Sequence, residues 1–456
     1  MQTWCAILLV YVLLLQHCLP LYAADEGEVS IGRKFSLVAQ SQLSLIREYT
    51  VRRYVERLGQ HIVARLDQPE FNYQFSVVQE PHINAFSVPG GYIYVHSGLI
   101  QKADSDDELA SVLGHEIAHV QGHHMVRQQQ DTRLLSYAGL AAMALAIINP
   151  VLAAGASSAA KATQLKYQRQ LEEEADYRGL QYMSQAGFDP QAMPRFFKTM
   201  QSEDLLNGVN VPPYLLSHPL SQERLSYIER TLKTLQWNQT APSSSFQLEQ
   251  VQAILRTLQE PRSRVIADYE KKVVETSDDP RTLALLGTVF LHYNDWERAR
   301  QSLEQASAKG VHLNRELGIA YLRLGQRDRA RQLLLQQSES DPADADTHRQ
   351  LCSLFLQEGS LSQAEQECRT AVDLDPCHDE AVLTLAQIFQ QQGKKGESRL
   401  LIAQAMEAQG RLESARSQYQ QAMQALGPTY PQAEELKQKT QELEELIREL
   451  PRQRGR

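Results

Sequence analysis

Apolar residues recur three and four positions apart between residues 109 and 120, which is the period of one face of an α-helix. These residues are Leu109, Val112, Leu113 and Val120. Ser105 is followed three residues later by Glu108, a capping box that typically begins a helix. The pattern therefore predicts a helix that begins near residue 105 and buries one face.

An alternating pattern precedes this helix. In GGYIYVHSG, Ile93 and Val95 alternate with Tyr92, Tyr94 and His96. Alternation of this kind is typical of a strand with one face against a core. We expect an edge strand that could pair with an extended peptide, and the simpler alternative is a hairpin strand within a small sheet.

A period of 34 residues organises the C-terminal half of the chain. Three sets of residues repeat at this interval: Gly325, Gly359 and Gly393; Pro342 and Pro376; Gly318, Cys352 and Ala386. This period, with glycine between two helical segments, is typical of the tetratricopeptide (TPR) helix-turn-helix. We therefore expect an all-α solenoid over residues 247–456, closed by a polar helix.

Turn and linker residues precede the solenoid in WNQTAPSSSF, residues 237–246. The chain has 456 residues, enough for two or three domains that each bury a core. We assign residues 25–236 to a first domain that mixes helices and strands. The net charge of -9 and the 22% charged residues indicate no basic field, which excludes nucleic acid as a partner.

The first 24 residues predict a cleaved signal peptide. An apolar run, AILLVYVLLL, begins at Ala6, and the small residues Ala23 and Ala24 precede an acidic stretch. No lysine or arginine precedes the run, so an uncleaved anchor is the alternative.

Cleavage would leave three cysteines, Cys352, Cys368 and Cys377. An odd number is not typical of a disulfide framework, although an exported protein could form one bridge. Cys352 takes the small position of its repeat, and Cys368 takes an apolar position on the adjoining helix. We expect both to be packing residues of the core.

The candidate chemistry lies on the predicted helix, in LASVLGHEIAHVQGHHMV. His115 and His119 are four residues apart and share one helical face, with Glu116 between them. In zinc hydrolases with His-Glu-x-x-His (HExxH) on a helix, the two imidazoles bind Zn²⁺ and the carboxylate takes a proton from the metal-bound water. We expect a metalloprotease with one zinc per chain and Glu116 as general base.

A third ligand is not found within the same stretch. In the longer motif His-Glu-x-x-His-x-x-Gly-x-x-His, Gly122 fits, but the last position is Met125. His123 and His124 fall short of that position. We expect them to be a pair at the helix end or groups that contact a ligand from behind.

The third ligand has a candidate in QLEEEADYRGLQYM, residues 170–183. The helical face of Glu172 also carries Ala175, Asp176 and Gly179, small residues that let a second helix approach closely. Glu173 shares its face with bulkier residues. We therefore choose Glu172 as ligand, with Asp176 one turn on, placed to accept a proton from a ligating imidazole.

Residues 134–160 contain no charge and are long enough to cross a membrane once. A single crossing would separate His119 from Glu172, and two crossings need on the order of forty residues. We therefore expect an apolar hairpin or lid over the cleft, with peripheral membrane contact as an option.

Four motifs together carry a family resemblance: NAFSVPGGYIYVHSGLI (84–100), DELASVLGHEIAHVQGHH (107–124), EEEAD (172–176) and SHPLSQER (217–224). With the TPR units, they resemble the BepA-like periplasmic zinc metalloproteases and chaperones, in the HExxH peptidase family that includes HtpX and the CAAX prenyl proteases. The resemblance implies an α+β zincin-like domain before the solenoid. It also implies Glu172 as the third zinc ligand, in agreement with the helical faces.

The resemblance implies a function as well. We expect an endopeptidase and chaperone in the periplasm for outer-membrane β-barrel proteins, with misfolded or stalled precursors as substrates. The barrel-assembly machinery would be a partner through the TPR domain. The alternative is mainly an assembly or scaffold factor whose peptidase is normally silent.

His218 and Arg224 belong to the last of these motifs. Three interpretations of His218 remain: a loop histidine, an electrophile that donates a hydrogen bond to the developing oxyanion, or a latch in the fourth position of zinc. The resemblance favours the latch. Arg224 completes the His-Pro motif, and we include it among the candidate catalytic residues.

Overall fold

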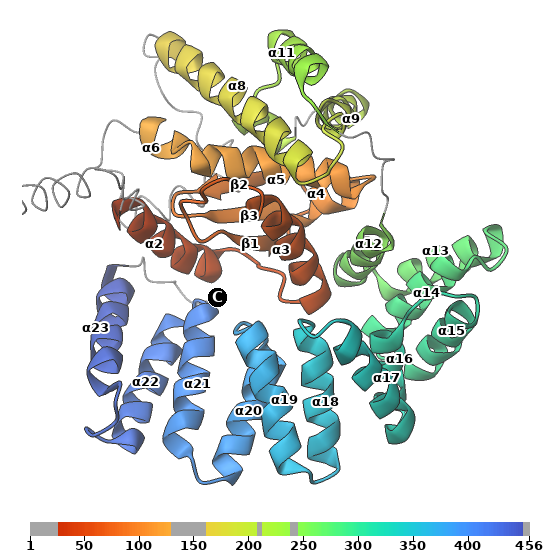
Figure 1. Cartoon of the computed structure of the whole chain (residues 1–456), viewed down its shortest axis with the longest axis vertical. Helices are drawn as coiled ribbons and strands as arrows, with labels where there is room; N and C mark the ends of the chain where they lie inside the picture. Colours follow the sequence, from red (N-terminus) through yellow and green to blue (C-terminus); the bar gives the residue numbers. More distant parts are fainter. Residues whose placement is uncertain (1–25, 129–160, 208–211, 238–244, 450–456) are drawn as a thin grey trace, which may run out of the picture.

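The computed structural model describes residues 26–128, 161–207, 212–237 and 245–449 (Figure 1). The predicted signal peptide, the apolar segment 134–160 and most of the predicted linker lie outside these residues. Helices and one small sheet make up residues 26–237, here called the N-terminal unit, and only helices follow.

The sheet has three strands, β1 (Gln74–Val78), β2 (Ala85–Val88) and β3 (Tyr92–His96). Their order is β1-β3-β2, with β3 parallel to β1 and antiparallel to β2. The expectation that residues 92–96 form an edge strand is therefore wrong, because β3 has a neighbour on each side. β1 and β2 are the outer strands. Residues 44–46 bond to β1, whereas no strand of the described residues pairs with the outer edge of β2, which forms a hairpin with β3.

Helices cover both faces of the sheet (Figure 1). Ile93 and Val95 face the main core with α3 (Tyr49–Val63) and α5 (Asp106–Gln121). The alternate side chain, Tyr94, packs in a second core with α2 (Glu26–Gln42). The alternation in the sequence therefore reflects a strand with a core on each side.

The predicted helix is α5, and Ser105 is its N-cap. The Ser105 hydroxyl accepts the backbone N–H of Glu108 at 3.3 Å, as the capping box predicts. The Glu108 carboxylate instead accepts the backbone N–H of Asp104 at 2.8 Å. The cap fixes where α5 begins and hence which residues face the sheet.

A second helix, α8 (Lys161–Gln185), packs very closely against α5. A Cβ atom on Gly114 would lie 3.2 Å from the carbonyl oxygen of Gly179, and one on Gly179 would lie 3.1 Å from the backbone nitrogen of His115. Both distances are tighter than ordinary contacts. The two glycines therefore let the face of α8 with Glu172 approach the histidine face of α5.

The described residues of the N-terminal unit contain five further helices: α4 (Ser97–Lys102), α6 (His124–Gln128), α9 (Ala192–Asn207), α10 (Pro213–Ser217) and α11 (Gln222–Thr234). Within the described part of the chain, no helix has both the length and the apolar character needed to cross a membrane.

The repeat array is defined here as α13–α23. Its helices are α13 (Arg262–Glu275), α14 (Pro280–His292), α15 (Trp296–Ala308), α16 (Asn314–Arg323), α17 (Arg327–Ser340), α18 (Ala345–Gln357), α19 (Leu361–Leu374), α20 (Asp379–Gln391), α21 (Lys395–Ala408), α22 (Leu412–Leu426) and α23 (Ala433–Glu449). Gly325, Gly359 and Gly393 end the first helix of successive pairs at φ between +75° and +78°, a conformation that favours glycine. The 34-residue period is thus the helix-pair period.

Cys352 and Cys368 are fully buried, and their sulfur atoms are joined in a disulfide between α18 and α19. The prediction that both pack in the core is right about burial, but it misses the covalent bond. The remaining cysteine, Cys377, is free and exposed. One crosslink therefore ties together the two helices of a single repeat.

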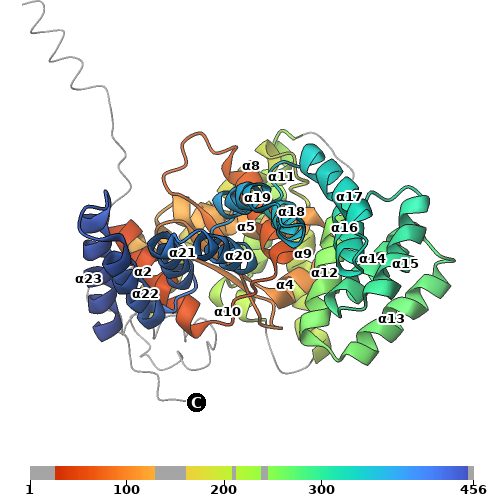
Figure 2. The ribbon, with the colours of Figure 1, turned by 90° about the horizontal axis from the view of Figure 1, so that it is seen from below.

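α12 (Phe246–Gln259) joins the two parts of the chain. Its residues Leu248, Val251 and Ile254 belong to the main core of the N-terminal unit, while Ala253 belongs to the core of the array. In the view from below, the array extends across the N-terminal unit from α13 to α23 (Figure 2).

Candidate metal centre

Four side chains converge where α5, α8 and the end of α10 meet: His115, His119, Glu172 and His218. One nitrogen or oxygen from each lies within 4.8 Å of all the others. His115 is fully buried and Glu172 is 5% exposed, so the cluster lies at the base of a cleft. Within the described residues, this is the group whose donors come close enough to hold a metal ion.

The spacing of these donors fits a single metal ion. Ligand atoms about 2.0–2.2 Å from a tetrahedral metal lie roughly 3.3–3.6 Å from one another. The Glu172 oxygens lie 3.4 Å from His115 Nε2 and 3.5 Å from His119 Nε2. His218 Nδ1 lies 3.4 Å from His115 Nε2 and 3.0 Å from the nearer Glu172 oxygen. The nitrogen and oxygen donors are of the kind that zinc binds.

Asp176 and Arg224 lie behind the ligands. Asp176 Oδ1 is 3.0 Å from His115 Nδ1, a contact that favours a proton on Nδ1 and so leaves Nε2 free for a metal. Arg224 binds both oxygens of Asp176, at 2.5 and 2.8 Å, and its Nη1 lies 2.9 Å from Glu172. Arg224 therefore orients two carboxylates of the site and does not face the cleft.

Burial and charge act in opposite directions on these carboxylates. Burial alone would raise the pKa of Asp176, but the Arg224 guanidinium holds that pKa below its usual range. Burial likewise opposes ionisation of Glu172, yet His218 and Arg224 bring its pKa well below the ordinary value. Both carboxylates are thus ionised at neutral pH and able to serve as ligand and hydrogen-bond acceptor.

The imidazoles of His115 and His119 differ in their electrostatics. Burial lowers the pKa of His115, but hydrogen bonds with Asp176 and Glu172 outweigh burial and raise it to about 9. Burial keeps the pKa of His119 well below 6.5. The two shifts differ in direction because Asp176 contacts the His115 ring.

Glu116 faces the same cleft, held by a residue that the sequence analysis missed. Ser87 of β2 donates a hydrogen bond of 2.8 Å to Glu116 Oε2. Glu116 Oε1 has no hydrogen-bond partner in the described structure and lies 3.5 Å from His218 Nε2. The sequence offered one indication of this role, because Ser87 is the polar residue in the otherwise apolar strand AFSV.

His123 and His124 have separate roles. His124 Nδ1 lies 2.9 Å from His119 Nδ1, so it contacts a candidate ligand from behind, as one of the two alternatives predicted. His123 has a φ of +52° and lies between Glu28 and Glu70, at 2.9 Å from each. It is therefore not in the metal cluster.

A cleft of about 300 Å³ opens beside the cluster. Phe86, Ser87 and Val88 of β2 line one wall, and Leu171 of α8 and His218 lie along others. β2 thus carries the free edge that the sequence analysis had assigned to β3. Glu173 is half-buried and outside the cluster, in agreement with the choice of Glu172.

Two comparisons with protein families agree with this arrangement. Residues 50–232 match Peptidase family M48, and residues 315–376 match the tetratricopeptide repeat. Residues 50–232 are thus similar to M48 peptidases, and TPR-like helices follow them, as the resemblance and the repeat period predict.

Curated relatives are similar over part of their length. The beta-barrel assembly-enhancing protease of Yersinia pestis is 32% identical over 230 residues, which are 48% of this chain and 47% of that protein. The protein of the same name from Escherichia coli (strain K12) is 30% identical over 207 residues, 44% and 42% of the two chains. Mitochondrial metalloendopeptidase OMA1 of Schizosaccharomyces pombe is 32% identical over 183 residues, 40% and 53%. The chain therefore spans about half the length of the curated relatives it matches.

Proposed function

We propose that this chain is a zinc-dependent endopeptidase that acts in the periplasm on outer-membrane β-barrel proteins during their assembly. The convergence of two imidazoles and a buried carboxylate beside Glu116 carries the catalytic part of the proposal. The substrate class is suggested by the names of the relatives, and the compartment by the predicted signal peptide, residues 1–24.

His115, His119 and Glu172 would hold the zinc ion, which supplies an activated water and polarises the scissile carbonyl. Glu116 takes the proton from the attacking water at Oε1, the oxygen that Ser87 leaves free. Asp176 keeps the His115 ring in the tautomer that presents Nε2. Arg224 holds Asp176 and Glu172 in place.

The free edge of β2 would position the substrate. A strand edge binds an extended peptide through backbone hydrogen bonds and selects weakly for sequence. Because Ser87 lies on this strand, the bound peptide would lie alongside the base that acts on it. Unfolded strands of barrel precursors are the kind of chain that such an edge accepts.

His218 supports a second part of the proposal, a peptidase that is silent at rest. Its Nδ1 lies within 4.8 Å of donor atoms of His115, His119 and Glu172, so His218 would be able to take the fourth position of a bound zinc ion, which water must occupy for catalysis. As a latch, His218 would exclude that water until a substrate or partner moves α10. An assembly factor with a normally silent peptidase is the alternative that this position also favours.

The test combines metal content with casein hydrolysis. We expect one zinc per purified chain, and we expect Glu116→Gln to keep the zinc while losing hydrolysis. Cleavage near the wild-type rate by Glu116→Gln would contradict the mechanism. Outer-membrane integrity in cells then separates the two functions, by comparing Glu116→Gln with a chain truncated after Gln259, where α12 ends.

A further inference from the structure

The repeat array meets the N-terminal unit mainly through polar side chains. The described part of the apolar core of α13–α21 includes no residue from 26–237. The helices α21–α23 receive one apolar side chain from that unit, the half-buried Leu37 of α2. Interfaces between domains that are this polar can open without exposing an apolar core.

Three arginines, Arg47 just before α3 and Arg52 and Arg53 in its first turns, instead contact three successive repeats. The pairs are Arg53 with Asp341 at 3.1 Å, Arg52 with Asp375 at 2.5 Å, and Arg47 with the carbonyl oxygen of Gln409 at 3.3 Å. The three acceptors are spaced at the 34-residue period, and each is the C-cap of the second helix of its repeat. Three successive repeats thus bind the segment 47–53, each through the residue at the same position, the C-cap of its second helix.

These C-cap positions favour binding of a cation, because they combine aspartate side chains with the negative ends of helix dipoles. Asp341 and Asp375 lie at the C-termini of α17 and α19, where the negative end of the helix dipole repels a carboxylate. An arginine offsets that cost by binding the carboxylate. Tyr49, between the arginines in sequence, lies against the ring of His378, with 5.4 Å between the ring centroids.

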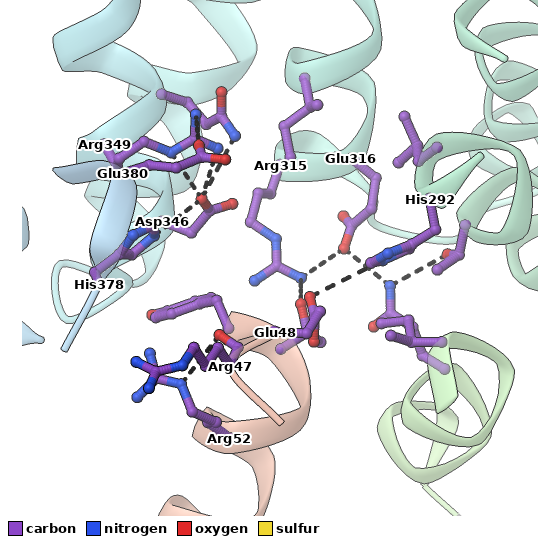
Figure 3. Close-up of a pocket in the computed structure, with 18 of the residues that line it drawn as sticks. Arg47, Glu48, Arg52, His292, Arg315, Glu316, Asp346, Arg349, His378 and Glu380 are labelled. Carbon is purple, nitrogen blue, oxygen red and sulfur yellow. Dashed lines mark hydrogen bonds and ion pairs between the residues drawn. The ribbon is translucent and has the colours of Figure 1, made fainter. Parts of the chain in front are cut away.

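A pocket of about 410 Å³ adjoins this segment, bounded by Arg47 and Arg52 and by the inner faces of α14, α16, α18 and α20 (Figure 3). Arg349 in this pocket is already paired with Asp346. Gln350, in contrast, is 1% exposed and its Oε1 accepts no hydrogen bond within the described structure. A buried acceptor of this kind requires a donor, such as the N–H of a peptide backbone.

We propose that the inner face of the repeat array is a docking site for a basic, tyrosine-containing segment of a partner protein, and that residues 47–53 occupy it as an internal ligand. A tethered ligand has an effective concentration on the order of millimolar. A partner segment must therefore compete with the arginines of α3. The array exposes its binding face only when these ion pairs are broken.

The experiment measures binding of a labelled peptide, IREYTVRRY (residues 46–54), to the full-length chain by fluorescence anisotropy. Arg52→Gln with Arg53→Gln removes the internal competitor, so we expect the peptide to bind this variant at least ten-fold more tightly than wild type. Asp341→Asn with Asp375→Asn removes the acceptors and should bind the peptide no better than wild type.

Controls separate docking from general charge. Arg57→Gln is the matched variant, because Arg57 lies on the same helix but contacts Gln247 of α12, and it should bind as wild type does. Arg53→Gln alone gives a second variant should the double variant fail to fold. Equal affinity of wild type and the arginine variants, or no binding by them, would overturn the proposal. The anisotropy readout is independent of zinc and of hydrolysis.

Discussion

Replacing Ser87 by alanine tests how the catalytic base is held. In the structure, Ser87 donates a 2.8 Å hydrogen bond to Glu116, and Glu116 is 1% exposed. A hydrogen bond to a charged, buried group contributes about 1.5–3 kcal/mol. If that bond holds the base in its reactive orientation, its loss should lower kcat by roughly 10- to 100-fold, since each 1.4 kcal/mol is about a factor of ten.

The assay is steady-state hydrolysis of a quenched fluorescent peptide with zinc content measured in parallel. We expect Ser87→Ala to lower kcat with little change in KM or in bound zinc, because the residue contacts the base and no ligand. Ser87→Thr keeps the hydroxyl and should recover most of the rate. Ser76→Ala, in β1 of the same sheet, is the matched control. A kcat for Ser87→Ala within two-fold of wild type would refute the reasoning.

Four further outcomes follow from the site and its surroundings. Glu172→Gln should weaken zinc binding far more than Glu173→Gln in a competition titration, and equal losses would contradict the choice of ligand. His218→Ala should raise casein hydrolysis and self-cleavage if it is a latch, whereas a lower rate would indicate an electrophile. Arg224→Leu leaves two buried carboxylates without their cation, at a cost of about 3–5 kcal/mol, so the melting temperature should fall by roughly 10 °C in a calorimetric scan. Burial, with a smaller contribution from His82, lowers the pKa of His96 to about 4 in the folded chain. Between about pH 6.5 and 4 the unfolded chain therefore binds more protons than the folded chain, so the free energy of unfolding falls as the pH falls. Denaturant unfolding should show a loss of roughly 2 kcal/mol between pH 7 and 5, and His96→Gln should not show this loss.

The ligand candidates could be predicted because they depend on local geometry. In any helix with 3.6 residues per turn, residues four apart, such as His115 and His119, lie on the same face. By the same geometry, Glu172 lies on the same face as Gly179, seven residues later. The structure brings these faces together at Gly114 and Gly179. The spacing of small residues in one helix was thus enough to predict which of the adjacent glutamates lies in the cluster.

Features that depend on pairing between distant segments could not be predicted in the same way. Alternation along residues 92–96 is compatible with an edge or a central strand, because periodicity reports faces and not neighbours. Ser87 gains its role only when β2 passes beside α5, which places it against Glu116. The contacts of Arg52 and Arg53 with the array join residues about 300 positions apart and leave no local pattern.

The cysteines illustrate an intermediate case. The 34-residue register placed Cys352 at a small, buried position, which the structure bears out. The repeat pattern did not predict that Cys368, on the second helix of the same repeat, faces Cys352. Their Cα atoms are 5.2 Å apart. The odd number of cysteines left a single bridge open, and the structure shows which two residues form it.

The double membership of α12 has a consequence for the order in which the chain folds. Repeat arrays are nearly one-dimensional, and an end repeat needs a cap before its neighbours are stable. Here Val251 and Ile254 anchor α12 in the N-terminal core, while Ala253 presents its other side to the array. The N-terminal unit is thus the cap from which the repeats can grow, so during synthesis it would fold before the array.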